Sequence, residues 1–250
     1  MATNLAEITR DLETAGLRIE LGTDFGIYRA RRNAQLERGS IYPMFDVACS
    51  YVDHTNGFWV CGFDADGELV HTQAVRLLNL MGSTLGNHLS IHRLKYITPD
   101  STPDPEQTHF VGPTALDRVT GRVAYQGDFW LRARGLGGPR SQGMTTRLSR
   151  LLLEIVHASW KPDYIFALVP KALAEKGAHL RYGYHHCEPG TWVGPDKQVT
   201  EEDYLIWMAT DELAHSLDHF VAAKPENVAR SLLNVAVGDT RVTPVVRAHD

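Results

Sequence analysis

The spacing of apolar residues in the first third of the chain predicts two helices and a hairpin of strands. Residues 4–16 place apolar side chains at intervals of three and four, the pattern of a short amphipathic helix. Residues 17–21 alternate as a strand does, and the basic segment 25–38 is expected to be helical. Within residues 57–78, two apolar runs flank Asp64-Ala-Asp-Gly67, whose residue types tolerate the backbone angles of a tight turn. This segment predicts a β-hairpin.

The second half of the chain contains longer and more apolar segments. Residues 98–113 are rich in Pro, Thr, Asp and Gln and predict a long loop, which is a lid, a binding segment or a plain insertion. Helical periodicity is strongest from Met144 to about Trp160. The uninterrupted apolar run 164–169 is typical of a strand buried on both faces. The other predicted elements are a strand over 123–133, a helix over 170–181, a strand over 204–209, a helix from there through 220, and a short helix at 225–233.

A glycine-rich turn, Arg134-Gly-Leu-Gly-Gly-Pro-Arg140, connects a predicted strand to the helix that begins at Met144. Helix N-termini present unpaired N–H groups and the positive end of the helix dipole, so such a turn suits a phosphate or pyrophosphate. A Rossmann site does not fit, because Arg140 stands where its third glycine belongs. A Walker A loop does not fit either, because no Lys-Ser/Thr pair follows the glycines. The turn is therefore an anion site of another kind or a purely structural turn.

Within this turn, Arg140-x-x-Gly143-x-Thr145 resembles the Arg/Gln-x-x-Gly-x-Gly/Ala signature of the GNAT acyltransferase superfamily. The elements that follow, a long helix, a buried strand and a helix that ends before Gly183-Tyr184, are in that family's order. The resemblance implies an α/β (α+β) fold, with a GNAT-like mixed, mostly antiparallel central sheet flanked by helices. It also implies that acyl-CoA or acetyl-CoA binds through its pyrophosphate to the loop residues Arg140, Ser141, Gln142, Gly143, Met144 and Thr145.

The candidate catalytic residues follow from this resemblance. Members of the family often carry a Tyr four residues before the final Gly, where it protonates the departing thiolate, and this chain has His179 there. An imidazole can act as a general acid, although a helix histidine without a role explains the residue equally well. For the general base we expect His186 and Glu188, which strand alternation places on one face, with His185 on the other. Neighbouring strand residues rarely converge on one ion, so we predict no metal site.

The N-terminal half has a fainter resemblance to acyl-homoserine-lactone synthases, which share the GNAT fold and use acyl-carrier protein and S-adenosylmethionine. It rests on Phe45-Asp46, a strand near Tyr51, the hairpin end Val75-Arg76-Leu-Leu and residues 85–89. Both leading acids of their Glu-x-Asp-x-Phe-Asp motif are absent. The resemblance implies a long-acyl or carrier-protein donor, and it makes Arg76 a candidate for contact with the acceptor or the carrier. An arginine that ends a strand is also commonly a solvated edge residue.

Four arginines, Arg29, Arg31, Arg32 and Arg38, lie close together in the sequence. Such a group docks an acidic carrier protein or a cofactor phosphate, or else it forms a solvated face. The three cysteines are widely spaced and indicate neither a zinc ribbon nor a disulfide framework. We expect Cys49 and Cys61 in the core. Cys187 would be a nucleophile only in a covalent mechanism, which direct acyl transfer does not require.

Composition excludes several classes of protein. The chain of 250 residues has 43% hydrophobic and 22% charged residues, as ordinary globular domains do. Its formal net charge of −5 argues against a general nucleic-acid-binding protein. The first residues include acids and lack the apolar core of a signal peptide, and no apolar run is long enough to span a membrane. We therefore expect a cytoplasmic protein.

Together these observations predict one GNAT-like acyltransferase domain over residues 1–223 and a C-terminal extension of unknown role over 224–250. We expect an N-acyltransferase that moves an acyl group from acyl-CoA, or from an acyl-carrier protein, to an amine of a small molecule or protein by direct attack. Its partners would be the donor and an amine or amino-acid-like acceptor; the oligomeric state stays open. The alternatives are an N-acyl amino acid synthase similar to the lactone synthases, a silent acyl-CoA-binding module, and an unrelated α/β domain.

Overall fold

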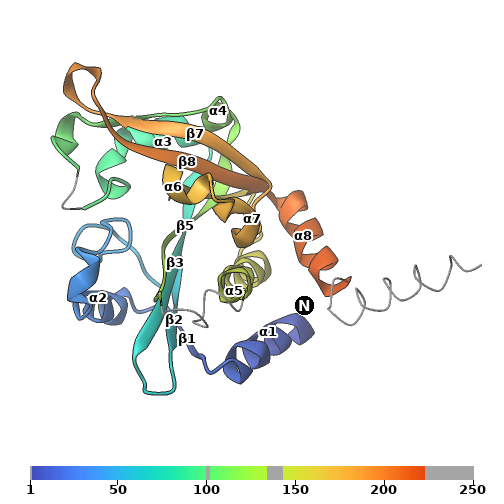
Figure 1. Ribbon diagram of the computed structural model, residues 1–250. Coiled ribbons are helices and arrows are strands. Elements are labelled where there is room, and N and C mark those ends of the chain that lie inside the picture. Colours follow the sequence, from blue (N-terminus) through green and yellow to red (C-terminus); the bar gives the residue numbers. More distant parts are fainter. Residues whose placement is uncertain (1, 100–101, 134–142, 223–250) are drawn as a thin grey trace, which may run out of the picture.

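The computed structural model describes residues 2–99, 102–133 and 143–222. These residues form one eight-stranded sheet in the order β1-β2-β3-β5-β6-β8-β7-β4, with helices on both of its faces (Figure 1). Neighbouring strands are antiparallel, except that β5 and β6 are parallel. The predicted sheet, mixed, mostly antiparallel and flanked by helices, is confirmed.

One half of the sheet consists of antiparallel strands that are close in sequence. They are β1 (Arg18–Gly22), β2 (Gly57–Phe63), β3 (Leu69–Leu80) and β5 (Gly121–Leu131). The predicted hairpin is β2–β3, and its turn is closed by backbone hydrogen bonds from Asp64 N to Glu68 O and from Gly67 N to Asp64 O, both 3.0 Å long. Gly67 has a φ of +79°, which a glycine adopts without the steric cost of a Cβ. The turn chemistry seen in the sequence therefore sets the register of this hairpin.

The other half of the sheet is built around the buried strand β6. It contains β6 (Tyr164–Pro170), β8 (Val199–Ala209), β7 (His186–Val193) and, at the edge, β4 (His109–Val111). β8 begins earlier than the predicted strand 204–209 because its first residues pair with β7. β4 lies in the segment predicted as a loop, so that prediction is wrong for these residues, which gain hydrogen bonds by pairing with the edge strand β7.

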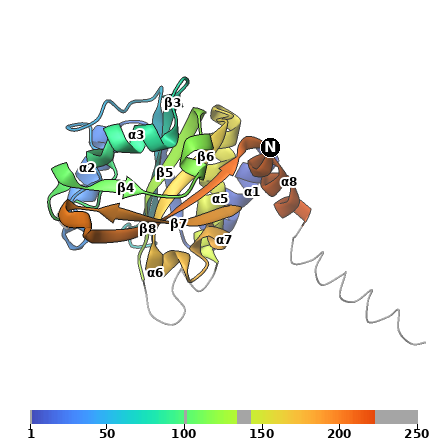
Figure 2. The same ribbon diagram turned by 90° about the horizontal axis from the view of Figure 1, so that it is seen from above.

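Helices cover both faces of the sheet, and each face has its own hydrophobic core (Figure 2). On one face lie α1 (Ala2–Thr14), α5 (Met144–Ser159), α6 (Lys171–Ala174), α7 (Ala178–Tyr182) and α8 (Thr210–Ala222). On the other lie α2 (Phe25–Asn33), α3 (Leu85–Ile91) and α4 (Ala115–Arg118). Short 3-10 turns occupy Leu36–Arg38, Arg93–Lys95, Pro105–Gln107 and Pro195–Lys197. We refer to these as the α5 face and the α2 face.

Two predicted helices are interrupted for local reasons. The helix expected over 25–38 begins after Asp24, whose side chain accepts hydrogen bonds from Gly26 N and Ile27 N, but it ends at Asn33. The helix expected over 170–181 is divided into α6 and α7 by Gly177, whose φ of +71° is incompatible with a right-handed helix. The helix predicted at 225–233 and the extension over 224–250 lie outside the described residues.

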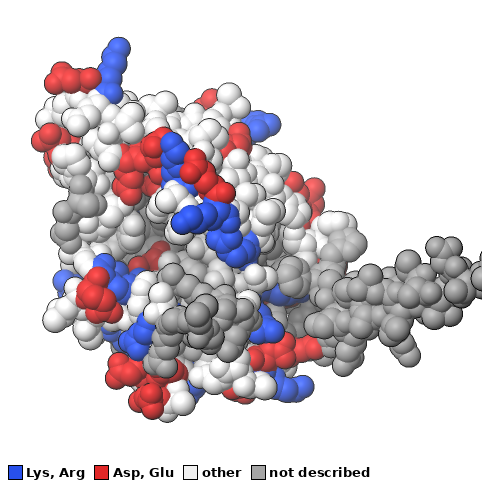
Figure 3. Space-filling view, viewed as in Figure 1, with Lys and Arg blue, Asp and Glu red and all other residues white. Residues whose placement is uncertain are grey.

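The surface carries charges of both signs. Acidic and basic side chains are interspersed over the face seen in Figure 3. In the described ranges, no helix combines the length and the apolar character needed to cross a bilayer.

Candidate functional site

The parallel strands β5 and β6 pair over a short stretch and then separate. The pairing joins Val123–Tyr125 to Tyr164–Phe166. Beyond that stretch each strand keeps only its outer neighbour: β5 pairs with β3 as far as Leu131, and β6 pairs with β8 as far as Pro170. Past the paired stretch, the edges of β5 and β6 that face each other therefore present backbone N–H and C=O groups that do not pair between these two strands. All residues of both strands are among those that the structure describes.

A bulge in β5 accompanies the separation. The β3–β5 register shifts between Thr72 and Ala74, and Asp128 has a φ of +51°. Bulges bend a strand and increase its twist, which turns β5 away from β6. The preceding Gly127 is required by packing, because a Cβ there would lie 2.7 Å from the Phe45 ring. The bulge thus separates β5 from β6 directly after the pairing ends at Tyr125.

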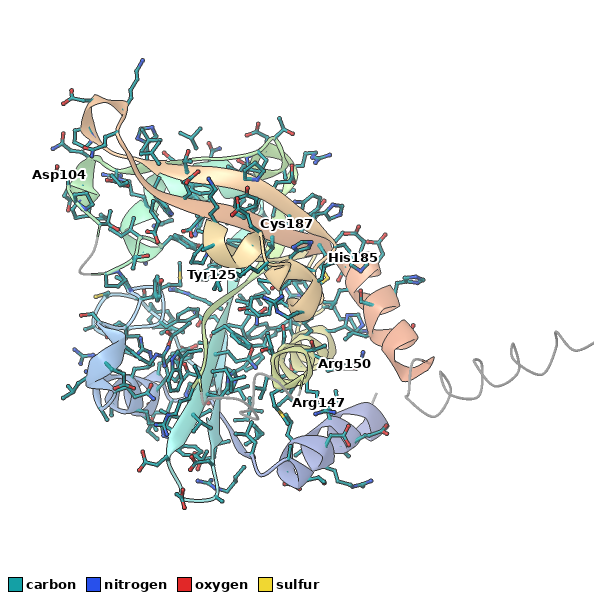
Figure 4. The ribbon with its side chains drawn as sticks, in the orientation of Figure 1. Asp104, Tyr125, Arg147, Arg150, His185 and Cys187 are labelled. Atoms are coloured by element: carbon teal, nitrogen blue, oxygen red, sulfur yellow. The ribbon has the colours of Figure 1, made fainter. Side chains whose placement is uncertain are left out.

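A cavity of about 250 Å³ fills the space between the separated strands. We call it the splay cavity. Its walls are formed by 126–130 of β5, 167–170 of β6, and the side chains of Arg32, Arg38, Tyr42, Tyr96, Tyr125, Leu173, Tyr182 and Asp203. Tyr96 and Tyr125 belong to the core of the α2 face, whereas Phe129 and Tyr182 pack on the core of the α5 face. The cavity therefore passes through the sheet, and Tyr125, one of its lining residues, is labelled in Figure 4.

Asp203, on β8, is a buried carboxylate at this cavity. It is 6% exposed, and its Oδ2 accepts a hydrogen bond of 2.9 Å from Trp192 Nε1. Burial raises the pKa of Asp203 to about 6, with a further increase from Glu201 and an opposing effect of the Trp192 hydrogen bond. A carboxylate with this pKa is largely ionised at neutral pH and is a better proton acceptor than an exposed one.

A buried ion-pair cluster lies on the α2 side of the splay cavity. Asp128 accepts hydrogen bonds from Arg32 Nε at 2.6 Å, from Arg38 Nη2 at 2.9 Å, and from the hydroxyl of Tyr28. Burial raises the pKa of Tyr28 well above its usual value, and so does the adjacent Asp128. The interpretation of the four arginines as one solvated face is wrong, because Arg32 is 2% exposed and the side chain of Arg38 is 8% exposed. The reason is that both arginines form ion pairs with Asp128, a buried residue that is distant from them in sequence.

The other two arginines of this group have different partners. Arg29 pairs with Asp46 at 3.0 Å, and Arg31 pairs with Glu20 and lies over the ring of Trp59. The four arginines therefore form separate contacts and not one docking surface.

Four tyrosines line the splay cavity, namely Tyr42, Tyr96, Tyr125 and Tyr182. Burial raises the pKa of Tyr42, Tyr96 and Tyr125, so all three are neutral hydrogen-bond donors. The hydroxyl of Tyr96 lies 2.8 Å from His88 Nε2. Burial lowers the pKa of His88 to about 4, so this imidazole is neutral at physiological pH.

The histidines and the glutamate predicted to be catalytic lie outside the lining of the splay cavity. His186 and Glu188 both contact Trp207: the His186 ring stacks on it at 4.0 Å, and Glu188 Oε1 accepts from Trp207 Nε1 at 2.7 Å. They thus share one face of β7, as the alternation predicts. His186 Nε2 is also 2.7 Å from Glu212 Oε1. His179 is half-buried on α7, and its buried Nδ1 has no partner among the described residues.

Arg76 and the glycine-rich loop are placed as follows. Arg76 donates to the carbonyl oxygens of Met44 at 3.2 Å and Tyr51 at 2.6 Å, so it fastens that segment to β3. It does not line the splay cavity. Of the predicted cofactor loop, Arg140, Ser141 and Gln142 lie outside the described residues. Gly143, with a φ of +70°, precedes α5; Met144 is in the core and Thr145 is half-buried.

A second cavity of about 450 Å³ lies on the α5 face, between α5, α7 and α8. We call it the helix cavity. Its lining includes Thr146, Arg150, Leu153, residues 180–185 and residues 215–217. Tyr182 lines both cavities. Figure 4 shows Arg147 and Arg150 on α5, and His185 near the start of α8.

The cysteines do not form a site. Cys61 is buried, as predicted, but Cys49 is exposed, so the prediction that it lies in the core is wrong. Cys49 follows Asp46 in a turn at the surface, where its N–H donates to Asp46 O. Burial and the neighbouring Glu188 raise the pKa of Cys187, which disfavours a thiolate. Among the described residues, no three His, Cys, Asp or Glu side chains come together in a way that could hold a metal ion.

Sequence reasoning did not identify Asp203 or Tyr182. Asp203 lies in a run of acidic residues that has the composition of a solvated strand end, and only its pairing beside Pro170 brings it to the cavity. Tyr182 is adjacent to the Gly183-Tyr184 pair used in the resemblance. The Gly-aromatic pair was therefore a usable signal for Tyr182, whereas Asp203 had none.

Comparison with known proteins gives structural similarity and no match in sequence. No family model matches the chain, and no curated protein matches it. A solved structure of the aminoglycoside acetyltransferase AAC(6')-Ib with coenzyme A and kanamycin is 14% identical, with a TM-score of 0.41, and the match covers 80% of this chain and 98% of that one. The spermidine/spermine N-acetyltransferase SpeG from Vibrio cholerae is 10% identical, with a TM-score of 0.44, covering 80% and 98%.

A ribosomal-protein-S5-alanine acetyltransferase from Vibrio fischeri is also similar, at 10% identity and a TM-score of 0.42, covering 78% of this chain and 94% of that one. The chain thus has structural similarity to GNAT acetyltransferases, the family that the sequence resembles, at low sequence identity. Identities this low carry no information about the substrate, which must be argued from the cavities themselves.

Proposed function

We propose that the protein is an N-acyltransferase that uses a thioester donor and works by direct attack of an amine. The observation that carries the proposal is the splay cavity, which passes through the sheet and combines unpaired strand edges with the buried carboxylate of Asp203. A cavity lined from both faces of the sheet would let donor and acceptor meet at one point from opposite sides. Most of the rate acceleration would come from holding the two reactants together.

The donor would lie between β5 and β6 as an extended arm. An acyl-CoA and an acyl-carrier protein both carry the acyl group on a linear arm that contains amide groups. The free edges of β5 and β6 offer that arm the hydrogen bonds of a strand. A backbone N–H from the same edge would stabilise the negative charge that develops on the thioester oxygen.

Asp203 is the proposed general base. The amine nitrogen attacks the thioester carbon, the C–N bond forms, and the C–S bond breaks. The proton lost by the amine goes to the Asp203 carboxylate, which lines the splay cavity and whose pKa of about 6 suits proton transfer near neutral pH. We prefer Asp203 to His186 and Glu188 because those two side chains are held around Trp207, outside the cavity lining.

The departing thiolate requires a proton donor on the α5 face. His179 is the residue that the family pattern indicates. Tyr182 is the alternative that the geometry favours, because its side chain lines both cavities and packs against Phe129 of β5. A phenol there would return a proton to the sulfur as the C–S bond breaks.

The far end of the donor would lie toward α5. The proposed anion site is the loop from Arg140 to Thr145, next to the N-terminus of that helix. The helix cavity, which shares Tyr182 with the splay cavity, would offer room for further parts of a long donor. The splay cavity would accept the acyl arm whether it is attached to coenzyme A or to a carrier protein.

The experiment that tests this proposal measures thiol release. Acetyl-CoA and a medium-chain acyl-CoA are each incubated with the protein and a panel of primary amines, and the free thiol and the acylated amine are both quantified. The proposal expects amine-dependent release of thiol in equal amount to product. A protein that binds coenzyme A in a thermal-shift assay but releases no thiol with any amine would be the silent binding module.

A further inference from the structure

The charges around the splay cavity narrow the class of acceptor. Its α2 side carries two guanidinium groups, Arg32 and Arg38, and the carboxylate of Asp128. These side chains are 2%, 8% and 2% exposed, respectively. The cluster therefore holds one more positive than negative charge in a place where water screens charge poorly.

The hydrogen bonds show which arginine has donors to spare. Arg38 uses Nη1 for Gln35 Oε1 and Thr72 Oγ1, both at 2.8 Å, and Nη2 for Asp128. Arg32 uses Nε for Asp128, while its buried Nη1 has no hydrogen-bond partner among the described residues. Because Arg32 lines the splay cavity, a ligand bound there would supply the acceptor that this buried donor lacks.

The rest of the cavity shows what that ligand must contain. A ligand carboxylate at Arg32 would neutralise the excess positive charge. It would also accept hydrogen bonds from a planar guanidinium, whose paired N–H donors match the two oxygens of a carboxylate. Asp203 lines the same cavity from β8 and, on the proposed function, accepts the proton of the attacking amine. An acceptor that carries both groups would place its amine toward Asp203 and its carboxylate toward Arg32.

We propose that the acceptor is a small amino acid whose carboxylate is bound by Arg32. This inference rests on the proposed acyl transfer, and the product would be an N-acyl amino acid. The amine nitrogen forms the new amide bond, the thioester C–S bond breaks, and the carboxylate is unchanged. Asp128 acts as a positioning residue, because its carboxylate holds Arg32 Nε, and Arg38 holds the other oxygen of that carboxylate.

The first experiment compares matched acceptors with the wild-type protein. Alanine, leucine and phenylalanine are each compared with their amides, and kcat/KM is expressed per concentration of unprotonated amine. The amides keep the amine and side chain but lack the negative charge. Loss of a charge-assisted hydrogen bond predicts a preference of about 10- to 100-fold for the free acids. Phosphoethanolamine is included as an amine with a different anionic group.

The second experiment uses variants to assign the preference to Arg32. In Arg32→Gln the ratio of acid to amide should fall to about one, and Arg32→Lys, which keeps the charge without the fork, should give an intermediate ratio. Arg31→Gln is the matched control, because Arg31 is on the same helix but outside the splay cavity lining, so its ratio should equal that of the wild type. If Arg32→Gln fails to fold, Arg32→Lys carries the assignment to Arg32, and equal wild-type rates for acid and amide would still overturn the inference.

A binding measurement separates this inference from the proposed function. Calorimetry compares an N-acetyl amino acid with its amide and needs no turnover. Turnover of acids and amides at equal rates would overturn the inference and leave acyl transfer standing. Tighter binding of the acid without any turnover would support the carboxylate site and overturn acyl transfer. A preference for phosphoethanolamine over all the amino acids would overturn the assignment to carboxylate.

Discussion

Asp128 and Asp203 line the same cavity from opposite sides of β6, yet their surroundings are opposite in character. Asp128 is paired with two arginines and a tyrosine, whereas Asp203 receives an indole N–H and lies near another acid, Glu201. The Asp128 carboxylate therefore pairs with the two arginines and orients them. The other is left as a base of raised pKa, which is why we assign the chemistry to Asp203.

The ionised form of Asp203 should cost the protein stability. Its pKa is about 6 in the folded protein and near the usual 3.8 in the unfolded chain. The unfolded state therefore loses this proton first, and the contribution of Asp203 to stability falls as the pH rises from 3.8 through 6. Asp203→Asn should raise the free energy of unfolding at pH 8 by up to about 3 kcal/mol and leave it nearly unchanged at pH 3.5. Urea denaturation at both pH values measures this, and an equal effect at both would contradict it.

Removal of the Asp128 charge should be strongly destabilising. Asp128→Asn keeps the shape and tolerates the φ of +51° but leaves two buried guanidinium groups without a counter-charge. The expected loss is about 3–5 kcal/mol in denaturant unfolding. Glu20→Gln is the control, since Glu20 pairs with Arg31 near the surface and should cost less than about 1 kcal/mol. Similar losses for both variants would argue against the buried cluster.

Gly143 allows a direct test of the cofactor loop. Its φ of +70° means that Gly143→Ala should cost about 1 kcal/mol of stability for backbone reasons alone. Gly82 has a φ of +76° and also has open space around it, so Gly82→Ala is a control with the same backbone cost. Only Gly143→Ala should weaken coenzyme A binding in calorimetry, because an added methyl group blocks close approach of a phosphate to the backbone. Equal affinities for the two variants would remove the loop from the donor site.

Tyr182 and His179 are the two candidates for the donor that protonates the departing thiolate, and substitution of the true donor should slow release of that thiolate. Tyr182→Phe should lower kcat by about 100-fold with acyl-CoA, and His179→Gln should change it little. The defect of Tyr182→Phe should disappear with an aryl thioester, whose thiolate leaves without a proton. Stopped-flow measurement of thiol release with both donors makes the comparison. If His179→Gln shows the donor-dependent loss instead, the role belongs to His179, as the family pattern indicates.

Local chemistry explains which parts of the fold were predictable. The β2–β3 turn, the long helix from Met144 and the buried run of β6 depend on residues close in sequence, and all three were found. The break at Gly177 was missed because a single glycine in a helical pattern does not reveal its φ. The burial of Arg32 was missed because its partner, Asp128, is 96 residues away.

The same distinction applies to the candidate site. The alternation of His186 and Glu188 could be predicted, but not the packing of both around Trp207, which comes from the β7–β8 register. Asp203 stands among acids that look solvated in the sequence. Its burial is a property of three paired strands, so no local pattern could identify it.

The central claim, that Asp203 takes the proton of an amine held in the splay cavity, is tested most directly by the pH dependence of acyl transfer. We would measure kcat/KM per concentration of unprotonated amine from pH 4.5 to 8.5 for the wild type and for Asp203→Asn. The account predicts that the wild-type value rises and levels off with an apparent pKa of about 6, and that the variant is about 100-fold slower or worse, without that inflection. An Asp203→Asn protein with the wild-type profile and rate would contradict it.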